Sequence, residues 1–211
     1  MTEGSTAGVV GILLAAGRGE RFGGAKLLAR VAPASNARAE ALAGNRAPAA
    51  AGDCVGVMAC RNLIAVLPRV VAVVRPGDAA LAAALGAAGA RIVRCANADF
   101  GMGASLACGV LATADAAGWV VALGDMPWIQ SSTIARVAGA VADGALVAAP
   151  FHRGQRGHPV GFGAACRAAL SALTGDDGAK SIVAAHRASL ARIDVDDAGA
   201  LRDVDRPADL A

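Results

Sequence analysis

The sequence contains few aromatic residues: Phe, Trp and Tyr make up 3% of its 211 residues, and Tyr is absent. Hydrophobic residues reach 55%, so the core must consist mainly of closely packed Ala, Val, Leu and Ile, and disorder over the whole length is excluded. A platform of stacked aromatic rings is disfavoured, and a net charge of +3 is too small for a clustered basic face. We therefore expect no nucleic-acid partner.

The sequence also lacks a long apolar run. Its longest uncharged stretch, residues 100–114, contains three glycines and is shorter than the roughly 20 apolar residues that a membrane-spanning helix needs. No basic region precedes the apolar residues 9–16, so these predict a buried strand rather than a signal peptide. We expect a soluble, cytoplasmic protein without a membrane partner.

The cysteines show no metal-binding or disulfide pattern. They are odd in number and widely spaced, without a C-x-x-C motif: Cys54, Cys60, Cys95, Cys108 and Cys166. This spacing argues against a structural zinc site and a disulfide framework, and it fits a reducing cytoplasm.

Short apolar runs alternate with helical stretches along the chain. The expected strands are residues 9–14, 70–74, 91–93, 119–123, 146–149, 159–162 and 191–195. The expected helices are 57–67, 78–88 with Asp78 as its cap, 103–114, 131–141 capped by Ser131 or Ser132, 164–173 and 179–188. This order predicts an α/β three-layer sandwich with a mostly parallel, Rossmann-like sheet, as one domain over residues 1–211. Residues 33–53, rich in Ala, Pro, Asn and Gly, predict a flexible insertion.

The most informative segment is the loop after the first strand, residues 13–26 (LLAAGRGERFGGAK). Its glycines let backbone N–H groups approach an anion, and Arg18, Arg21 and Lys26 add positive charge. The spacing fits neither the dinucleotide fingerprint G-x-G-x-x-G nor the P-loop G-x-x-x-x-G-K-[ST]. An ordinary flexible turn with solvated basic residues is the alternative.

Four later segments carry candidate polar groups. Ser105 lies where a helix begins, either as its cap or as a ligand contact, and Asp125 follows a buried strand, where it suits a divalent cation or a turn. Arg156 and His158 lie in a Gly-rich loop. Residues 175–180 and an acidic stretch that includes Asp203 and Asp205 complete the set, and the acidic stretch is alternatively a solvated tail.

The L-A-A-G-x-x-x-R-F-G-x-x-K pattern at residues 14–26 resembles the nucleotide-binding signature of the molybdenum-cofactor nucleotidyltransferases. Four further motifs match that family in order: G-M-x-x-S-L-x-x-G, D-M-P, R-G-H-P-V-x-F and D-x-D-x-P-x-D-L. A G-D-x-G-A-[RK] segment at residues 175–180 is also similar. The resemblance covers residues 8–30 and 55–210.

The resemblance implies a role for each group of residues. Nucleotide binding is assigned to Ala15, Ala16, Gly17, Arg18, Gly19, Arg21, Lys26 and Ser105. Catalysis is assigned to Arg18, Lys26 and Asp125; Mg²⁺ to Asp125 and Asp205, with Asp203 as the competitor; and the acceptor to Arg156, His158 and Lys180.

The resemblance further implies transfer of CMP from CTP to the terminal phosphate of molybdenum-molybdopterin. Ala16 favours the cytidylyl-transferring branch, because guanylyl-transferring members typically carry L-A-G-G here. The alternatives are a GTP-using or sugar-phosphate nucleotidyltransferase of the same fold, or a non-catalytic module that binds molybdenum cofactor. A molybdoenzyme or its maturation chaperone is the implied protein partner.

Overall fold

The computed structural model describes residues 8–19, 22–31 and 53–210. Arg21, and the expected insertion at residues 33–53 apart from its last residue, lie outside these ranges.

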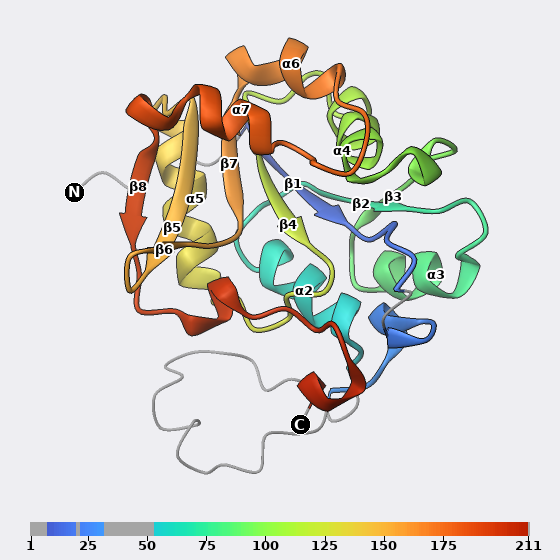
Figure 1. Cartoon of the computed structure of the whole chain (residues 1–211). Coiled ribbons are helices and arrows are strands. Elements are labelled where there is room, and N and C mark those ends of the chain that lie inside the picture. The colour runs from blue at the N-terminus through green and yellow to red at the C-terminus, as the bar shows by residue number, and fades with distance from the viewer. Residues whose placement is uncertain (1–7, 20–21, 32–52, 211) are drawn as a thin grey trace.

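In the described residues one sheet of eight strands forms the centre of the molecule (Figure 1). The strands are β1 (Val9–Leu14), β2 (Val70–Val74), β3 (Arg91–Arg94), β4 (Gly118–Leu123), β5 (Val147–His152), β6 (Gln155–Arg156), β7 (Val160–Gly163) and β8 (Ala191–Asp194). Their order is β3-β2-β1-β4-β7-β5-β6, and β8 pairs with β5. The pairs within β3-β2-β1-β4 and the β5–β8 pair are parallel, whereas β7 runs antiparallel to β4 and β5.

Helices cover both faces of the sheet. They are α2 (Val55–Ile64), α3 (Ala79–Ala87), α4 (Met102–Leu111), α5 (Ser131–Ala142), α6 (Arg167–Ser171) and α7 (Lys180–Ala185). Side chains of β1 alternate between two cores: Val9 and Leu13 pack with α2, α3 and α5, while Val10 and Ile12 pack with α4, α6 and α7. Continuous apolar strands follow from burial on both faces. The predicted α/β architecture with a mostly parallel sheet is confirmed.

The start of α5 corrects one prediction. Ser131 and Ser132 lie inside the helix and do not cap it. Instead the carboxylate of Asp197, only 2% exposed, accepts hydrogen bonds from the Gln130 backbone N–H at 2.9 Å and the Thr133 hydroxyl at 2.7 Å. A carboxylate at a helix N-terminus satisfies N–H groups that have no partner within the helix, so the C-terminal segment is tied to α5.

The cysteines require a second correction. Cys95 follows β3, Cys108 lies in α4, and the two form a disulfide across a sequence separation of 13 residues. Their spacing carries no local signal, because only the packing of α4 beside the end of β3 brings the two thiols together. Cys54, Cys60 and Cys166 are free.

Candidate active site

A cavity of about 780 Å³ opens at the carboxyl ends of β1, β2 and β4. Its walls come from the loops that follow these strands, the loop between β3 and α4, and the beginnings of α3 and α4. Loops at the carboxyl ends of parallel strands meet at one edge of the sheet, which is the usual ligand site of open α/β sheets. The predicted site residues are therefore expected around this cavity.

The glycine-rich loop forms one wall. Ala16, Gly17, Arg18 and Gly19 line the cavity, whereas the Ala15 side chain is buried in the core beneath it. Gly19 has φ +62°, and a Cβ atom there would lie 2.6 Å from the backbone oxygen of Gly24, so only glycine fits. The structure therefore places the glycine-rich loop in the wall of this cavity.

A basic cluster stands beside this loop. The Arg18 Nη2 and Arg75 Nη1 atoms lie 2.7 Å and 2.5 Å from the same oxygen, Oδ1 of Asp99. Arg75 also donates from Nε to the Ala16 backbone oxygen at 2.8 Å. The two guanidinium groups lower the pKa of the Asp99 carboxyl, so it stays ionised at neutral pH. Arg75 and Asp99 both line the cavity, and sequence reasoning assigned neither of them.

Ser105 lines the cavity from inside α4, one turn after the helix begins. Its hydroxyl donates to the Gly101 backbone oxygen at 3.4 Å, so the alternative that Ser105 only caps the helix is wrong. The Gly103 N–H donates to the Gly175 backbone oxygen at 2.8 Å, and Asp176 joins the cavity wall. The segment that begins at Gly175 therefore lies over the first turn of α4.

Three carboxylates gather where Lys26 and Asp125 line the cavity. Carboxylate oxygens of Asp125, Asp203 and Asp205 lie within 4.8 Å of one another. The Lys26 Nζ atom lies 2.8 Å from Asp125 Oδ2 and 3.5 Å from Asp205 Oδ1. We call these four residues the carboxylate cluster. The sequence predicted Asp125 and Asp205 as metal ligands with Asp203 as the competitor, and the structure brings all three together.

The electrostatics of this cluster fit a divalent cation. Burial raises the pKa of the Asp203 carboxyl, and the charges of Asp205 and Asp125 raise it further, while Lys26 lowers it. The Oδ1 atom of Asp125 is buried without a hydrogen-bond partner among the described residues. Repelling carboxylates and an unsatisfied oxygen are the donor set that a hard cation such as Mg²⁺ or Mn²⁺ stabilises.

The C-terminal segment is held in place by its own hydrogen bonds. The Val204 N–H donates to the Asp125 backbone oxygen at 2.9 Å, which brings the two flanking aspartates to the end of β4. The Asp209 carboxylate then accepts from the N–H groups of Asp205 and Arg206 at 2.8 Å and 2.7 Å. This turn holds the backbone of Asp205 beside Lys26.

His158 lies at the same edge of the sheet. Its backbone N–H donates to the Ala200 oxygen at 2.9 Å, and it precedes a cis peptide bond to Pro159. The Nδ1 atom is buried without a partner in the described residues. Burial lowers the pKa of the imidazole, Arg156 lowers it further and Asp125 raises it. A neutral imidazole near Asp125 is suited to hydrogen bonding rather than to carrying charge.

The other two predicted acceptor residues are exposed. Lys180 begins α7, is 75% exposed in its side chain, and pairs with Asp177 at 3.7 Å. Arg156 is exposed in the short strand β6. None of the three predicted acceptor residues, His158 included, is among the described residues that line the cavity.

The architecture is the Rossmann-like α/β fold that is also found in a solved nucleotidyl transferase structure. The chain belongs to the family with a MobA-like NTP transferase domain, whose model matches residues 11–190. No curated protein sequence matches it. No helix in the described part of the chain is both long enough and apolar enough to cross a bilayer.

Several solved structures share this fold. Protein Rv0371c of Mycobacterium tuberculosis H37Rv superposes with a TM-score of 0.71 at 23% identity, over 95% of both chains. The same protein in complex with manganese has a TM-score of 0.64 at 21% identity, over 89% of this chain and 88% of that one. A nucleotidyl transferase from Methanothermobacter gives 0.72 at 21%, covering 95% and 93%. CMP:2-keto-3-deoxy-manno-octonic acid synthetase, complexed with CTP, gives 0.69 at 13%, covering 95% and 94%.

Proposed function

We propose that this protein transfers CMP from CTP to the terminal phosphate of molybdenum-molybdopterin and releases pyrophosphate. The observation that carries this proposal is one cavity lined by the basic glycine-rich loop and by Asp125 and Lys26 of the carboxylate cluster. A triphosphate needs the positive charge and backbone donors of the loop, and its bound cation needs the carboxylates. Membership of the MobA-like family supplies the reaction class.

The proposed reaction is a substitution at the α-phosphorus. A phosphate oxygen of the acceptor forms the new P–O bond, and the bond from the α-phosphorus to the oxygen bridging it to the β-phosphorus breaks. The electron pair leaves with pyrophosphate. An acceptor phosphate is already ionised at neutral pH, so no side chain has to remove a proton. Arg18 and Lys26 bind the departing phosphates, and the protein contributes by positioning and by neutralising charge.

The carboxylate cluster would hold the metal. Asp125, with Asp205 and Asp203, offers oxygen ligands, and Lys26 already balances part of their charge. A bound Mg²⁺ neutralises phosphate charge and orients the phosphate oxygens. If a cation were bound to these carboxylates, Lys26 would be available to bind a phosphate in place of Asp125.

The choice of CTP rests on Ala16. Ala16 is only 5% exposed and packs with the apolar cluster that includes Val10 and Ile12. The fold is shared with a CTP-bound synthetase, which supports a cytidine nucleotide in such a cavity.

The first experiment measures melting temperature against CTP, GTP, ATP and UTP, each with and without Mg²⁺. A ligand at 100 times its Kd adds about 2.7 kcal/mol, which is a shift of roughly 5–10 °C for a chain of this length. We expect the largest shift with CTP and Mg²⁺ together. A larger shift with GTP would contradict the cytidylyl assignment, and no shift with any nucleotide would favour a non-catalytic module.

The second experiment tests the acceptor. Purified protein with the preferred nucleotide, Mg²⁺ and molybdenum-molybdopterin should release pyrophosphate, and omission of the acceptor or the metal should abolish the release. Sugar phosphates as acceptors provide the comparison. Release with a sugar phosphate alone would replace the molybdopterin assignment. If the molybdopterin product forms, a molybdoenzyme or its maturation chaperone is the expected recipient.

A further inference from the structure

Arg75 joins the two loops on either side of its own strand. It directly follows β2, which lies between β1 and β3 in the sheet. From there its Nε donates to the Ala16 backbone oxygen in the loop after β1, at 2.8 Å. Its Nη1 donates to Asp99 Oδ1 in the loop after β3, at 2.5 Å. One guanidinium group therefore connects two cavity walls that separate strands supply.

The bond to Ala16 also sets the direction of a neighbouring donor. The peptide unit between Ala16 and Gly17 is planar and trans, so its C=O and N–H point in opposite directions. Arg75 holds the oxygen, and the Gly17 N–H is consequently directed away from Arg75. Gly17 lines the cavity, and within the described residues its N–H donates to no carbonyl. Glycine would otherwise leave this peptide free to rotate.

The bond to Asp99 extends the same arrangement to Arg18. Asp99 Oδ1 accepts from Arg18 as well as from Arg75. The side chains of Arg18 and Asp99 are 57% and 60% exposed, whereas that of Arg75 is 21% exposed. Exposed ion pairs hold their partners weakly, so the anchored member of the three is Arg75.

We propose that Arg75 is a positioning residue for the nucleotide: it orients the glycine-rich loop through Ala16 and holds the wall after β3 through Asp99. This inference rests on the proposed nucleotide site. Arg75 need not touch the nucleotide, because it acts through the Gly17 N–H and through Arg18. Two donor groups of one rigid fork are required, and a lysine at this position offers the same charge without that geometry.

The test compares Arg75→Lys with Arg69→Lys. Arg69 directly precedes β2, whereas Arg75 directly follows it. Arg69 also forms an ion pair, with Asp115, at the amino ends of the parallel strands and away from the cavity. The probe is CTP with Mg²⁺, or whichever triphosphate gives the largest melting shift, with Kd measured by calorimetry. Arg75→Lys should raise that Kd on the order of tenfold, the effect of one hydrogen bond to a charged group. Arg69→Lys should leave it unchanged.

Two further measurements separate positioning from a general folding defect. The Kd of Mn²⁺ alone reports on the carboxylate cluster, and the melting temperature without ligand reports on the fold. Arg75→Lys should change neither by more than Arg69→Lys does. Asp99→Asn should also weaken nucleotide binding, and it should weaken it less in the Arg75→Lys background than in the wild type, because the two residues share one contact.

Four other outcomes would each overturn part of this proposal. Wild-type affinity in Arg75→Lys overturns the positioning role and leaves the proposed function standing. Parallel losses of nucleotide affinity, Mn²⁺ affinity and melting temperature replace positioning by a structural role. Tighter binding in Asp99→Asn means that Asp99 competes with phosphate for the arginines. Absence of nucleotide binding in the wild-type protein overturns both the proposed function and this inference.

Discussion

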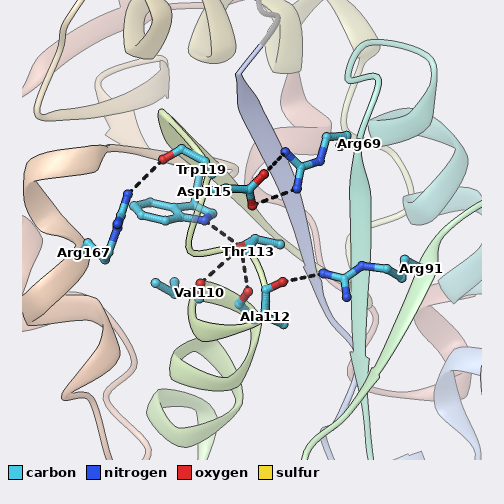
Figure 2. A network of polar contacts seen from close by, with 10 residues as sticks. Arg69, Arg91, Val110, Ala112, Thr113, Asp115, Trp119 and Arg167 are labelled. Carbon is cyan, nitrogen blue, oxygen red and sulfur yellow. Dashed lines mark hydrogen bonds and ion pairs between the residues drawn. The ribbon is translucent and has the colours of Figure 1, made fainter.

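Polar side chains are paired at the amino ends of the parallel strands, the amino edge of the sheet. At the carboxyl ends of these strands, the carboxyl edge, some buried polar atoms have no partner among the described residues. At the amino ends of the parallel strands, Trp119 Nε1 donates to Thr113 Oγ1 at 2.9 Å, and Thr113 donates in turn to the Gly109 oxygen at 2.8 Å (Figure 2). Beside them Arg69 binds Asp115 through two hydrogen bonds of 2.7 Å and 3.0 Å. Within the described residues, the buried side-chain atoms without partners, Asp125 Oδ1 and His158 Nδ1, both lie at the carboxyl edge.

This difference distinguishes structural polar groups from those of the candidate site. A network whose donors and acceptors are paired stabilises the fold and has nothing left to offer a ligand. The carboxyl edge instead contains carboxylates that repel one another, an imidazole nitrogen without a partner and a loop whose backbone N–H groups can donate. Such an arrangement costs stability, and a bound cation and nucleotide would remove that cost. Substitutions at the carboxyl edge should therefore lower activity without lowering stability, and substitutions at the amino edge should lower stability without lowering nucleotide affinity.

The largest expected effect is at the carboxyl edge. Asp125→Asn removes the charge of the central carboxylate, and turnover should fall by about 100-fold or more, as on loss of one preorganised electrostatic group. The melting temperature should not fall, because the change also relieves repulsion within the carboxylate cluster. Pyrophosphate release and thermal unfolding measure the two quantities. Asp143→Asn, at the exposed end of α5, is the matched control, and near-normal turnover in Asp125→Asn would remove this residue from the mechanism.

The second prediction concerns Thr113, at the amino edge of the sheet. Thr113→Val keeps the side-chain shape and leaves the buried Trp119 N–H without its acceptor. The free energy of unfolding should fall by about 1–3 kcal/mol, or roughly 3–10 °C in melting temperature, with nucleotide affinity unchanged. Thr113→Ser keeps the hydroxyl and should lose less. A loss of nucleotide affinity in Thr113→Val would show that the two edges are coupled.

A smaller effect of opposite sign is expected at Asp203. Its pKa in the folded state is raised, so the stability linked to it is present below its ordinary pKa and lost as the pH rises through the raised value. At neutral pH Asp203→Asn should therefore stabilise the metal-free protein by less than about 1 kcal/mol. The stabilisation that Mg²⁺ or Mn²⁺ adds should shrink in the same variant. A metal-free variant less stable than the wild type would contradict the repulsion argument.

The smallest expected effect is the pH dependence that His158 contributes. Its folded pKa is lowered, so the unfolded chain takes up a proton first as the pH falls through about 6.5, and stability is lost below that value. The wild-type melting temperature should therefore drop more between pH 7.5 and 5.5 than that of His158→Gln. His186→Gln, in the segment after α7, is the control and should follow the wild type. Equal drops in all three proteins would show that His158 does not titrate as a buried group.

Local patterns predicted most of the fold. Apolar runs such as residues 70–74 coincide with their strands, because burial on both faces requires continuous apolar sequence. Strand β6 was not predicted, since two exposed residues, Gln155 and Arg156, carry no apolar signal. The candidate site was predicted where loops follow strands directly, as for Arg18, Lys26 and Asp125. Arg75 occupies the same kind of position after β2, and that signal could have found it.

Taken by itself, the sequence determined the alternation of strands and helices, the chemistry of the glycine-rich loop and the acidic character of the C-terminal stretch. All three are local, because periodicity, glycine and charge act on neighbouring residues. The tertiary structure alone decided that Lys26 meets Asp125 and Asp205, that Cys95 pairs with Cys108, and that Asp197 caps a helix 67 residues earlier in the chain. These contacts join segments that are separated along the chain, and the order of the strands and the packing of the helices decide which segments meet.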